Sequence, residues 1–139
     1  MKNKHAALPP VLLVEPQFVL RHTIVSVARE LGLVEFHEAT NMARAQAALN
    51  SRKFLGVVLD MGDGPESAAL LAELRKGSFI CSAEIPVILM TSKPGARDDA
   101  NLKLFNPVGV LQKPFKIGEL LQSVSFLASR TLSAETHKA

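Results

Sequence analysis

Residues 54–64 read Phe-Leu-Gly-Val-Val-Leu-Asp-Met-Gly-Asp-Gly. Residues 56–59 form a short apolar run with two β-branched side chains, which predicts a strand that is buried on both faces. The run stops at Asp60, and turn-forming residues follow it: Gly62, Asp63, Gly64 and Pro65. Asp60 is therefore expected at the carboxyl end of a buried strand, where open α/β sheets place their ligand sites. The simpler alternative is that Asp60 only ends the strand and caps a turn.

The composition is that of one globular domain. The chain has 139 residues, of which 47% are hydrophobic and 21% charged, and its formal net charge is +3. The single cysteine, Cys81, excludes an internal disulfide and a multi-cysteine metal site. Seven Phe without any Trp or Tyr argue against a stacking platform for single-stranded nucleic acid, so no nucleic-acid partner is expected.

The sequence predicts neither a membrane span nor a secretion signal. No apolar run approaches the length that is needed to cross a bilayer. The first ten residues are basic but lack the apolar core of a signal peptide. The chain is therefore expected in the cytoplasm, without a membrane partner.

Short apolar runs alternate with segments of helical period along the chain. Residues 1–10 are predicted to be a lead-in and residues 130–139 a polar tail, so the domain is expected to span residues 11–129. The predicted strands are 11–14, 34–38, 56–59, 85–90 and 108–112, and the predicted helices are 17–31, 42–49, 65–76, 96–105 and 116–129. Strands that alternate with helices predict an α/β domain, with a parallel sheet between two helical layers. The helix at 96–105 has the weakest apolar pattern.

Side chains that can carry chemistry follow four of the predicted strands: Glu15, Asp60, Thr91 and Lys113. Polar residues commonly follow buried strands, which explains each of them taken alone. Because parallel strands end at one edge of their sheet, however, all four are expected to converge there. Such a group suits phosphoryl transfer to a carboxylate, with Asp60 as the nucleophile. Lys113 and Thr91 would bind phosphoryl oxygens, and Glu15, together with a divalent cation, would neutralise charge.

Five segments carry a resemblance to a known family. They are Val-Leu-Leu-Val-Glu at 11–15, Arg-Glu-Leu-Gly-Leu at 29–33, Val-Val-Leu-Asp-Met at 57–61, Ile-Pro-Val-Ile-Leu-Met-Thr-Ser at 85–92 and Gln-Lys-Pro-Phe at 112–115. Over about residues 11–128 the chain resembles the receiver domains of two-component response regulators, including the stand-alone chemotaxis regulator.

The resemblance implies a flavodoxin-like (βα)5 fold, with a five-stranded parallel sheet in the order 2-1-3-4-5 and two helices on one face and three on the other. It implies that Asp60 is the phosphoacceptor, Thr91 the switch hydroxyl and Lys113 the phosphate-contacting lysine. It also implies a cis bond between Lys113 and Pro114. The phosphoryl donor would be a histidine kinase or a histidine phosphotransfer protein. The signal would leave through about residues 96–128 by contact with an unknown downstream protein, so the chain is not expected to be an enzyme.

The acidic pocket departs from the family pattern. In the family two adjacent acids usually follow the first strand, and the second binds Mg²⁺, whereas this chain has Glu15-Pro16. Proline has no side-chain ligand atom. The resemblance leaves Glu15, Asp60 and the backbone of Gly62 as candidate Mg²⁺ ligands, with Asp63 as a weaker candidate. The loss of one carboxylate predicts weak Mg²⁺ binding.

A second departure is Val110, where the family usually has Tyr or Phe, so aromatic rotation coupled to Thr91 cannot operate in its usual form. Two interpretations stay open. One is a receiver that is phosphorylated on Asp60, which the presence of Asp60, Thr91 and Lys113 favours. The other is a phosphorylation-independent pseudo-receiver that acts as a protein-binding module. A flavin- or nucleotide-binding enzyme is disfavoured, because the loop after Val14 lacks a glycine-rich phosphate cradle.

Two further points concern assembly and output. No DNA-binding helix-turn-helix is expected after residue 128, so the signal is expected to pass by protein contacts. The sequence leaves open whether the chain forms a homodimer.

Overall fold

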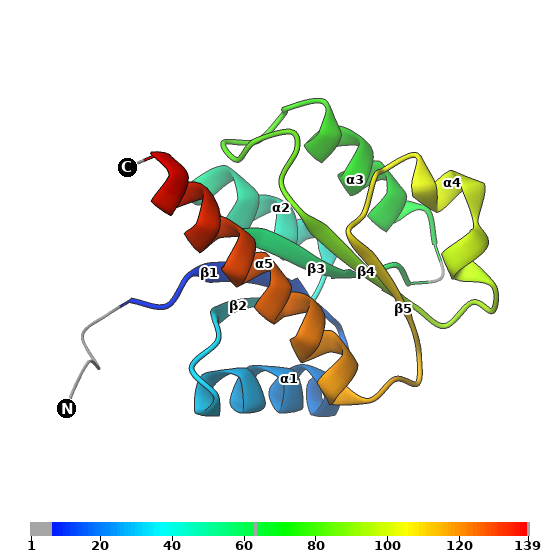
Figure 1. Ribbon diagram of the computed structural model, residues 1–139. Coiled ribbons are helices and arrows are strands. Elements are labelled where there is room, and N and C mark those ends of the chain that lie inside the picture. The colour runs from blue at the N-terminus through cyan, green and yellow to red at the C-terminus, as the bar shows by residue number, and fades with distance from the viewer. Residues whose placement is uncertain (1–6, 63, 139) are drawn as a thin grey trace.

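One parallel sheet forms the centre of the molecule, as Figure 1 shows. The computed structural model describes residues 7–62 and 64–138. All neighbouring strands are parallel, and their order is β2-β1-β3-β4-β5, so the predicted topology is confirmed. The strands are β1 (Pro10–Val14), β2 (Glu35–Ala39), β3 (Gly56–Asp60), β4 (Val87–Thr91) and β5 (Gly109–Gln112).

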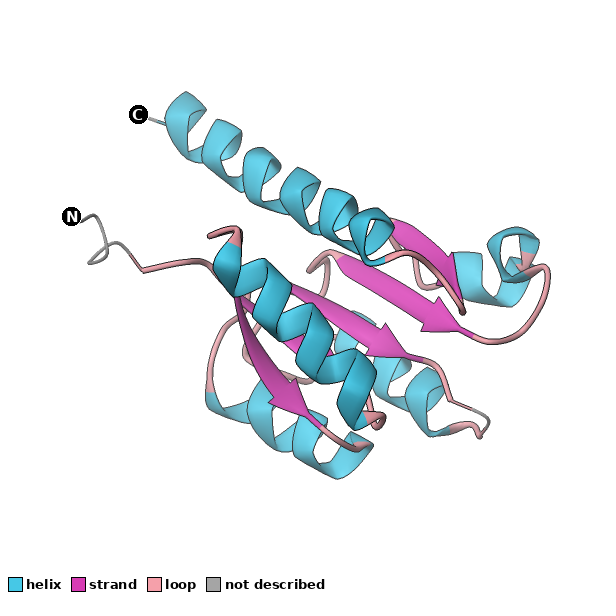
Figure 2. Cartoon of the chain, turned by 90° about the horizontal axis from the view of Figure 1, so that it is seen from below, coloured by secondary structure: helices cyan, strands magenta, loops and turns pink. Residues whose placement is uncertain are grey.

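Helices cover both faces of this sheet. They are α1 (Phe18–Glu30), α2 (Met42–Ser51), α3 (Glu66–Arg75), α4 (Ala100–Lys103) and α5 (Ile117–Lys138), with a 3-10 turn η2 (Ala96–Asp98) before α4. Helices α1 and α5 pack on one face, and α2, α3 and α4 pack on the other (Figure 2). This is the predicted arrangement of two helices against three, and it gives the domain two hydrophobic cores.

The inner strands are apolar because both of their faces are buried. Every residue of β3 and β4 is buried. Along β3, Val58 belongs to the core under α1 and α5, whereas Val57 and Leu59 belong to the core under α2 and α3. Successive side chains of a strand point to opposite faces, so a strand between two helical layers needs a continuous apolar run. The polar residue that ends the run marks the edge of the sheet.

Local signals set the ends of two helices. The side chain of Asn41 accepts a hydrogen bond from the backbone N–H of Arg44 at 2.8 Å and so caps α2. Gly32, just after α1, has a φ of 66°, in the left-handed region that favours glycine at the end of a helix. These caps fix where the chain turns back toward the sheet.

The predicted single helix at 96–105 is wrong, because the segment divides into η2 and α4. Asp99 lies between them, and its side chain accepts a hydrogen bond from the backbone N–H of Asn101 at 2.8 Å, which starts a new helix there. None of the four residues of α4 is buried. The weak apolar pattern of this segment therefore corresponds to a short helix that packs loosely on the sheet.

The prediction that the last helix ends at Ser129 is also wrong, since α5 continues to Lys138. Residues 130–138 contain neither Gly nor Pro, so no strong helix breaker interrupts them. The predicted polar tail is thus helical as far as Lys138. Within the two described ranges, no helix combines the length and the apolarity that crossing a bilayer requires.

Candidate functional site

The four predicted site residues lie at the carboxyl edge of the sheet. Asp60 and Thr91 are the last residues of β3 and β4, and Glu15 and Lys113 directly follow β1 and β5. Because β3 lies between β1 and β4, Asp60 is at the middle of this edge. The topology therefore brings together residues that are up to 98 positions apart in the sequence.

Lys113 bridges the two acids. Its Nζ lies 2.7 Å from Oε1 of Glu15 and 2.8 Å from Oδ1 of Asp60. The exposed fractions of these side chains are 14% for Lys113, 0% for Glu15 and 11% for Asp60. Charged groups with so little access to water require close partners, and here the ammonium supplies one for each carboxylate.

The electrostatics of the bridge keep Lys113 charged. Burial is the largest single effect and lowers the pKa of Lys113, but the hydrogen bonds to Asp60 and Glu15 and the negative charges of these two acids together raise it by more, so the net shift of the pKa is upward. The stabilisation that the charged lysine provides is therefore complete below the ordinary lysine pKa. It is lost only as the pH rises through the raised value.

The second oxygen of Glu15 is also held by the protein. Oε2 accepts a hydrogen bond from the backbone N–H of Gln17 at 3.0 Å. Glu15 is thus fully buried with both oxygens engaged, one by Lys113 and one by the first turn after β1. By contrast, no described residue donates a hydrogen bond to Oδ2 of Asp60, so among the described residues this is the one oxygen of the two acids without a partner.

Thr91 ends β4, the strand beside β3, and is buried. Its Oγ1 accepts a hydrogen bond from the backbone N–H of Lys93 at 3.1 Å, and its carbonyl accepts one from the backbone N–H of Lys113 at 2.7 Å. Within the described ranges its own O–H has no acceptor, so this proton is available for an oxygen bound at Asp60. Thr91 therefore connects the site to the loop that leads to η2.

Two features in and directly after β5 bear on the predicted role of Thr91 as a switch hydroxyl. The Lys113–Pro114 peptide bond is cis, as the resemblance implied. Val110 is half-buried and packs against the core under α2 and α3. Its carbonyl accepts a hydrogen bond from Nε of Arg97 at 3.1 Å. The Arg97 side chain therefore links η2 to the backbone of β5, and no aromatic side chain at position 110 takes part.

The described residues around Asp60 do not form a ready Mg²⁺ site. A cavity of about 330 Å³ beside Asp60 has apolar walls at Pro16, Met42 and Met61, and the carboxylate of Glu66 also lines it. No group of three or more acidic, His or Cys side chains in the described part of the chain could hold a metal ion. Asp63, the weaker candidate ligand, lies outside the described residues. Glu15 is 0% exposed, and each of its oxygens already contacts a donor, so it is poorly placed to bind a metal ion.

We predict that Mg²⁺ binds in the millimolar range or more weakly, and that Pro16→Asp strengthens binding by at least about tenfold by restoring a carboxylate. Amide chemical-shift titration of both proteins with MgCl2 measures this. Pro107→Asp, which adds the same charge far from the site, is the control and should bind as the wild type does. Equal affinities of wild type and Pro16→Asp would show that another group already compensates for Pro16.

Comparison with known proteins places this fold among receiver domains. No protein-family model and no curated protein sequence matches the chain. Among solved structures, the Francisella response regulator 1452 receiver domain is 25% identical, with a TM-score of 0.74 over 88% of this chain and 98% of that chain. The Pseudomonas aeruginosa receiver domain of sensor histidine kinase PA1611, with magnesium in its active site cleft, is 22% identical, with a TM-score of 0.69 over 88% and 99%. The Vibrio cholerae chemotaxis protein CheY4 is 20% identical, with a TM-score of 0.74 over 87% and 99%.

The chain therefore has the flavodoxin-like fold of response regulator receiver domains. Sequence reasoning found the four residues at its carboxyl edge but missed Arg21 and the backbone N–H of Gln17, which hold the Glu15 loop. An arginine one turn into the helix after the first strand is the only sequence signal that could have pointed to the former.

Proposed function

We propose that this chain is a response regulator receiver that accepts a phosphoryl group on Asp60. The observation that carries the proposal is the Lys113 ammonium 2.8 Å from Oδ1 of Asp60, with Oδ2 free of described donors. Thr91, on the neighbouring strand end, has an O–H proton to donate. The site thus combines a nucleophilic carboxylate, a fixed positive charge and a hydroxyl donor.

The phosphoryl donor would be a phosphohistidine of a histidine kinase or a histidine phosphotransfer protein. An oxygen of Asp60 attacks phosphorus, the nitrogen–phosphorus bond breaks, and the histidine nitrogen keeps the bonding electrons. Lys113 pairs with the charge on the phosphoryl oxygens, and Thr91 donates a hydrogen bond to one of them. Phe18 and Val19, exposed by 65% and 74% at the start of α1, offer apolar surface for a protein donor near the site.

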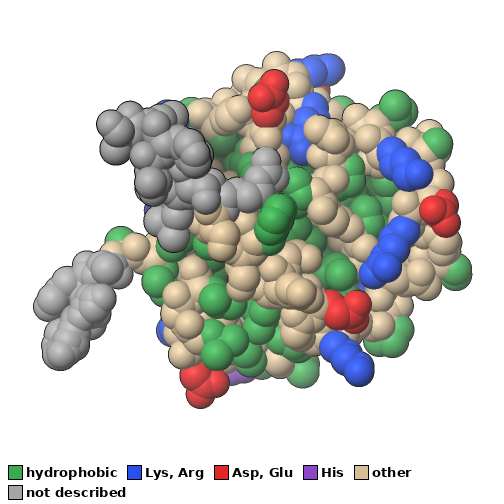
Figure 3. Space-filling model, in the orientation of Figure 1, with side chains coloured by type: hydrophobic (Ala, Val, Ile, Leu, Met, Phe, Trp, Pro, Cys, Tyr) green, Lys and Arg blue, Asp and Glu red, His purple; other side chains and the backbone are tan. Residues whose placement is uncertain are grey.

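A downstream protein would bind a different surface of the domain, the one formed by α4, β5 and α5. Figure 3 shows Lys and Arg side chains on this side of the molecule, interspersed with acidic ones. Leu104 and Val108 are exposed there by 80% and 43%. A mixed charged and apolar surface suits a protein partner in the cytoplasm.

The pseudo-receiver remains the second candidate, and specific observations favour it. Pro16 supplies no ligand, both oxygens of Glu15 are engaged, and Val110 replaces the aromatic residue of the family. In that case the chain would bind its partner whether or not Asp60 is modified.

We expect an acyl-phosphate mimic on Asp60 to change residues 91–110 most. Drawing the Thr91 hydroxyl toward the phosphoryl group disturbs the contact of its Oγ1 with Lys93, and the loop to η2 follows. Hydrogen exchange with and without beryllofluoride measures the change, and Asp60→Asn should abolish it. An unchanged exchange pattern at saturating mimic, together with partner binding that is indifferent to Asp60→Asn, would favour the pseudo-receiver.

The proposed function is tested by incubating the protein with acetyl phosphate or phosphoramidate, with and without Mg²⁺, and measuring intact mass. A species heavier by one phosphoryl group is expected, and Mg²⁺ should accelerate its formation only at high concentration. Absence of this species under all conditions would contradict the proposal.

A further inference from the structure

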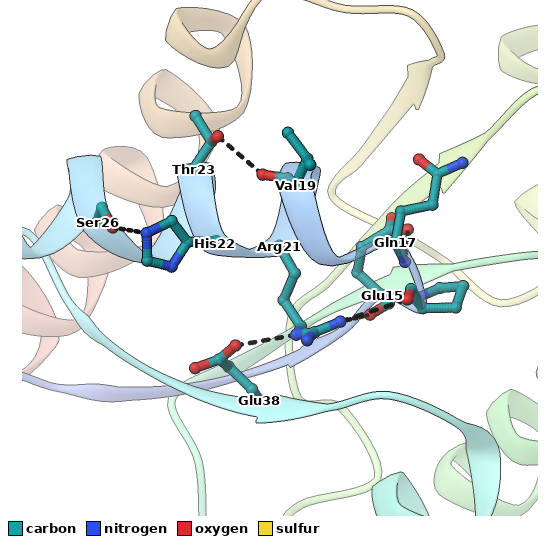
Figure 4. Close-up of polar contacts among 9 residues, drawn as sticks. Glu15, Gln17, Val19, Arg21, His22, Thr23, Ser26 and Glu38 are labelled. Carbon is teal, nitrogen blue, oxygen red and sulfur yellow. Dashed lines mark hydrogen bonds and ion pairs between the residues drawn. The ribbon is translucent and has the colours of Figure 1, made fainter.

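Arg21 joins three parts of the fold beside the site (Figure 4). Its Nη1 donates to the carbonyl of Glu15 at 3.0 Å and approaches the carbonyl of Pro16 at 3.4 Å. Its Nε donates to Oε1 of Glu38, in β2, at 2.9 Å. The side chain is only 11% exposed, and its guanidinium carbon lies 5.6 Å from the centre of the Phe18 ring.

These contacts fix the backbone of the loop that carries Glu15. The backbone N–H of Glu15 already donates to the carbonyl of Ala39 at 3.1 Å, so one side of the residue is tied to β2. Pro16 has no N–H and therefore cannot donate a hydrogen bond that would hold the loop. The guanidinium, with its rigid set of donors, holds two successive carbonyls that would otherwise need water.

The position of this backbone decides where the Glu15 carboxylate lies. That carboxylate is fully buried and contacts Lys113 at 2.7 Å, and Lys113 contacts Asp60 at 2.8 Å. A chain of short polar contacts therefore runs from Glu38 through Arg21 and the Glu15 loop to the ammonium at Asp60.

We infer that Arg21 is a positioning residue for the acceptor site: by holding the Glu15–Pro16 backbone, it keeps Glu15 against Lys113 and so sets the place of the ammonium beside Asp60. Its contribution to phosphoryl transfer rests on the proposed function. Its contribution to the position of Lys113 does not.

The chain supplies a matched control for this inference. Arg29 also lies on α1 and also pairs with β2, with Nη2 3.0 Å from Oε2 of Glu35, but the pair is exposed and does not touch the Glu15 loop. Arg21→Met and Arg29→Met therefore each remove one ion pair between the same two elements. Only the first also releases the loop.

The first measurement is the position of the Lys113 side-chain Hε–Cε signal in a proton–carbon correlation spectrum of the folded variants. Arg21→Met should move this signal in the direction that Glu15→Gln moves it, and Arg29→Met should leave it in place. Arg21→Lys keeps a charge for Glu38 but lacks the guanidinium fork, so it should not restore the signal. A wild-type signal in folded Arg21→Met would overturn the inference. Should Arg21→Met not fold, Arg21→Gln serves with the same two outcomes.

The second measurement is the rate of phosphorylation by acetyl phosphate. The maximal rate should fall about tenfold in Arg21→Met, with little change in the half-saturating concentration, because the loss concerns Lys113 rather than binding of the donor. Equal loss in Arg29→Met would reduce Arg21 to a structural role. If the wild type itself is not phosphorylated, the proposed function fails, while the lysine signal still decides the inference about Arg21.

Discussion

Replacing Lys113 by Met is expected to lower the free energy of unfolding by about 3–5 kcal/mol, because it leaves Glu15 buried without its cation. Glu15 is 0% exposed, and after the substitution only the backbone N–H of Gln17 would still contact its carboxylate. Asp60, at 11% exposed, would lose the same partner. Urea denaturation followed by circular dichroism measures the loss.

Two further variants show whether the uncompensated acid is the cause. Lys76→Met removes the exposed pair with Glu73, at 3.4 Å, and should lower the stability far less than Lys113→Met does. The double variant Lys113→Met with Glu15→Gln should regain a large part of the stability, since it removes the buried charge along with its partner. If Lys113→Met were as stable as Lys76→Met, the bridge would not be the main partner of Glu15.

Asp60→Asn is expected to abolish phosphoryl acceptance altogether, since an amide oxygen cannot form the acyl phosphate. The variant should keep its fold, because an asparagine fits the same place at the end of β3 and Lys113 retains Glu15 as a partner. Phosphorylation by acetyl phosphate, read by intact mass, should fall from a clear signal to none.

The matched control is Asp98→Asn, which removes an exposed carboxylate in η2 and should be phosphorylated as the wild type is. Residual phosphorylation of Asp60→Asn at the wild-type level would show that another carboxylate accepts the group, and the role given to Asp60 would be wrong.

The sheet and the polar residues at its carboxyl edge could be predicted from the sequence because both depend on short-range patterns. A strand buried on two faces requires an unbroken apolar run, and Val57 to Leu59 show one that ends at Asp60. The βα alternation then places Glu15, Thr91 and Lys113 at the same edge, whatever the details of packing.

What the sequence could not predict depends on distances between segments. Whether Glu15 faces a metal or contacts Lys113 is decided by the last few ångströms of packing. The separation of the two residues along the chain carries no information on this. The role of Arg21 was missed for the same reason, because its acceptors are backbone carbonyls, which every residue has. The predicted helix boundaries were wrong where a single cap such as Asp99, or the lack of a helix breaker after Ser129, outweighed the apolar pattern.

Locating the phosphoryl group tests the central claim most directly. Protein treated with acetyl phosphate is quenched with hydroxylamine, which converts an acyl phosphate to a hydroxamate, and the modified residue is identified by peptide sequencing in the mass spectrometer. We predict a hydroxamate at Asp60 and at no other carboxylate, and none in Asp60→Asn. A hydroxamate at another residue, or none in the wild type at full exposure to the donor, would contradict the claim that Asp60 is the phosphoacceptor.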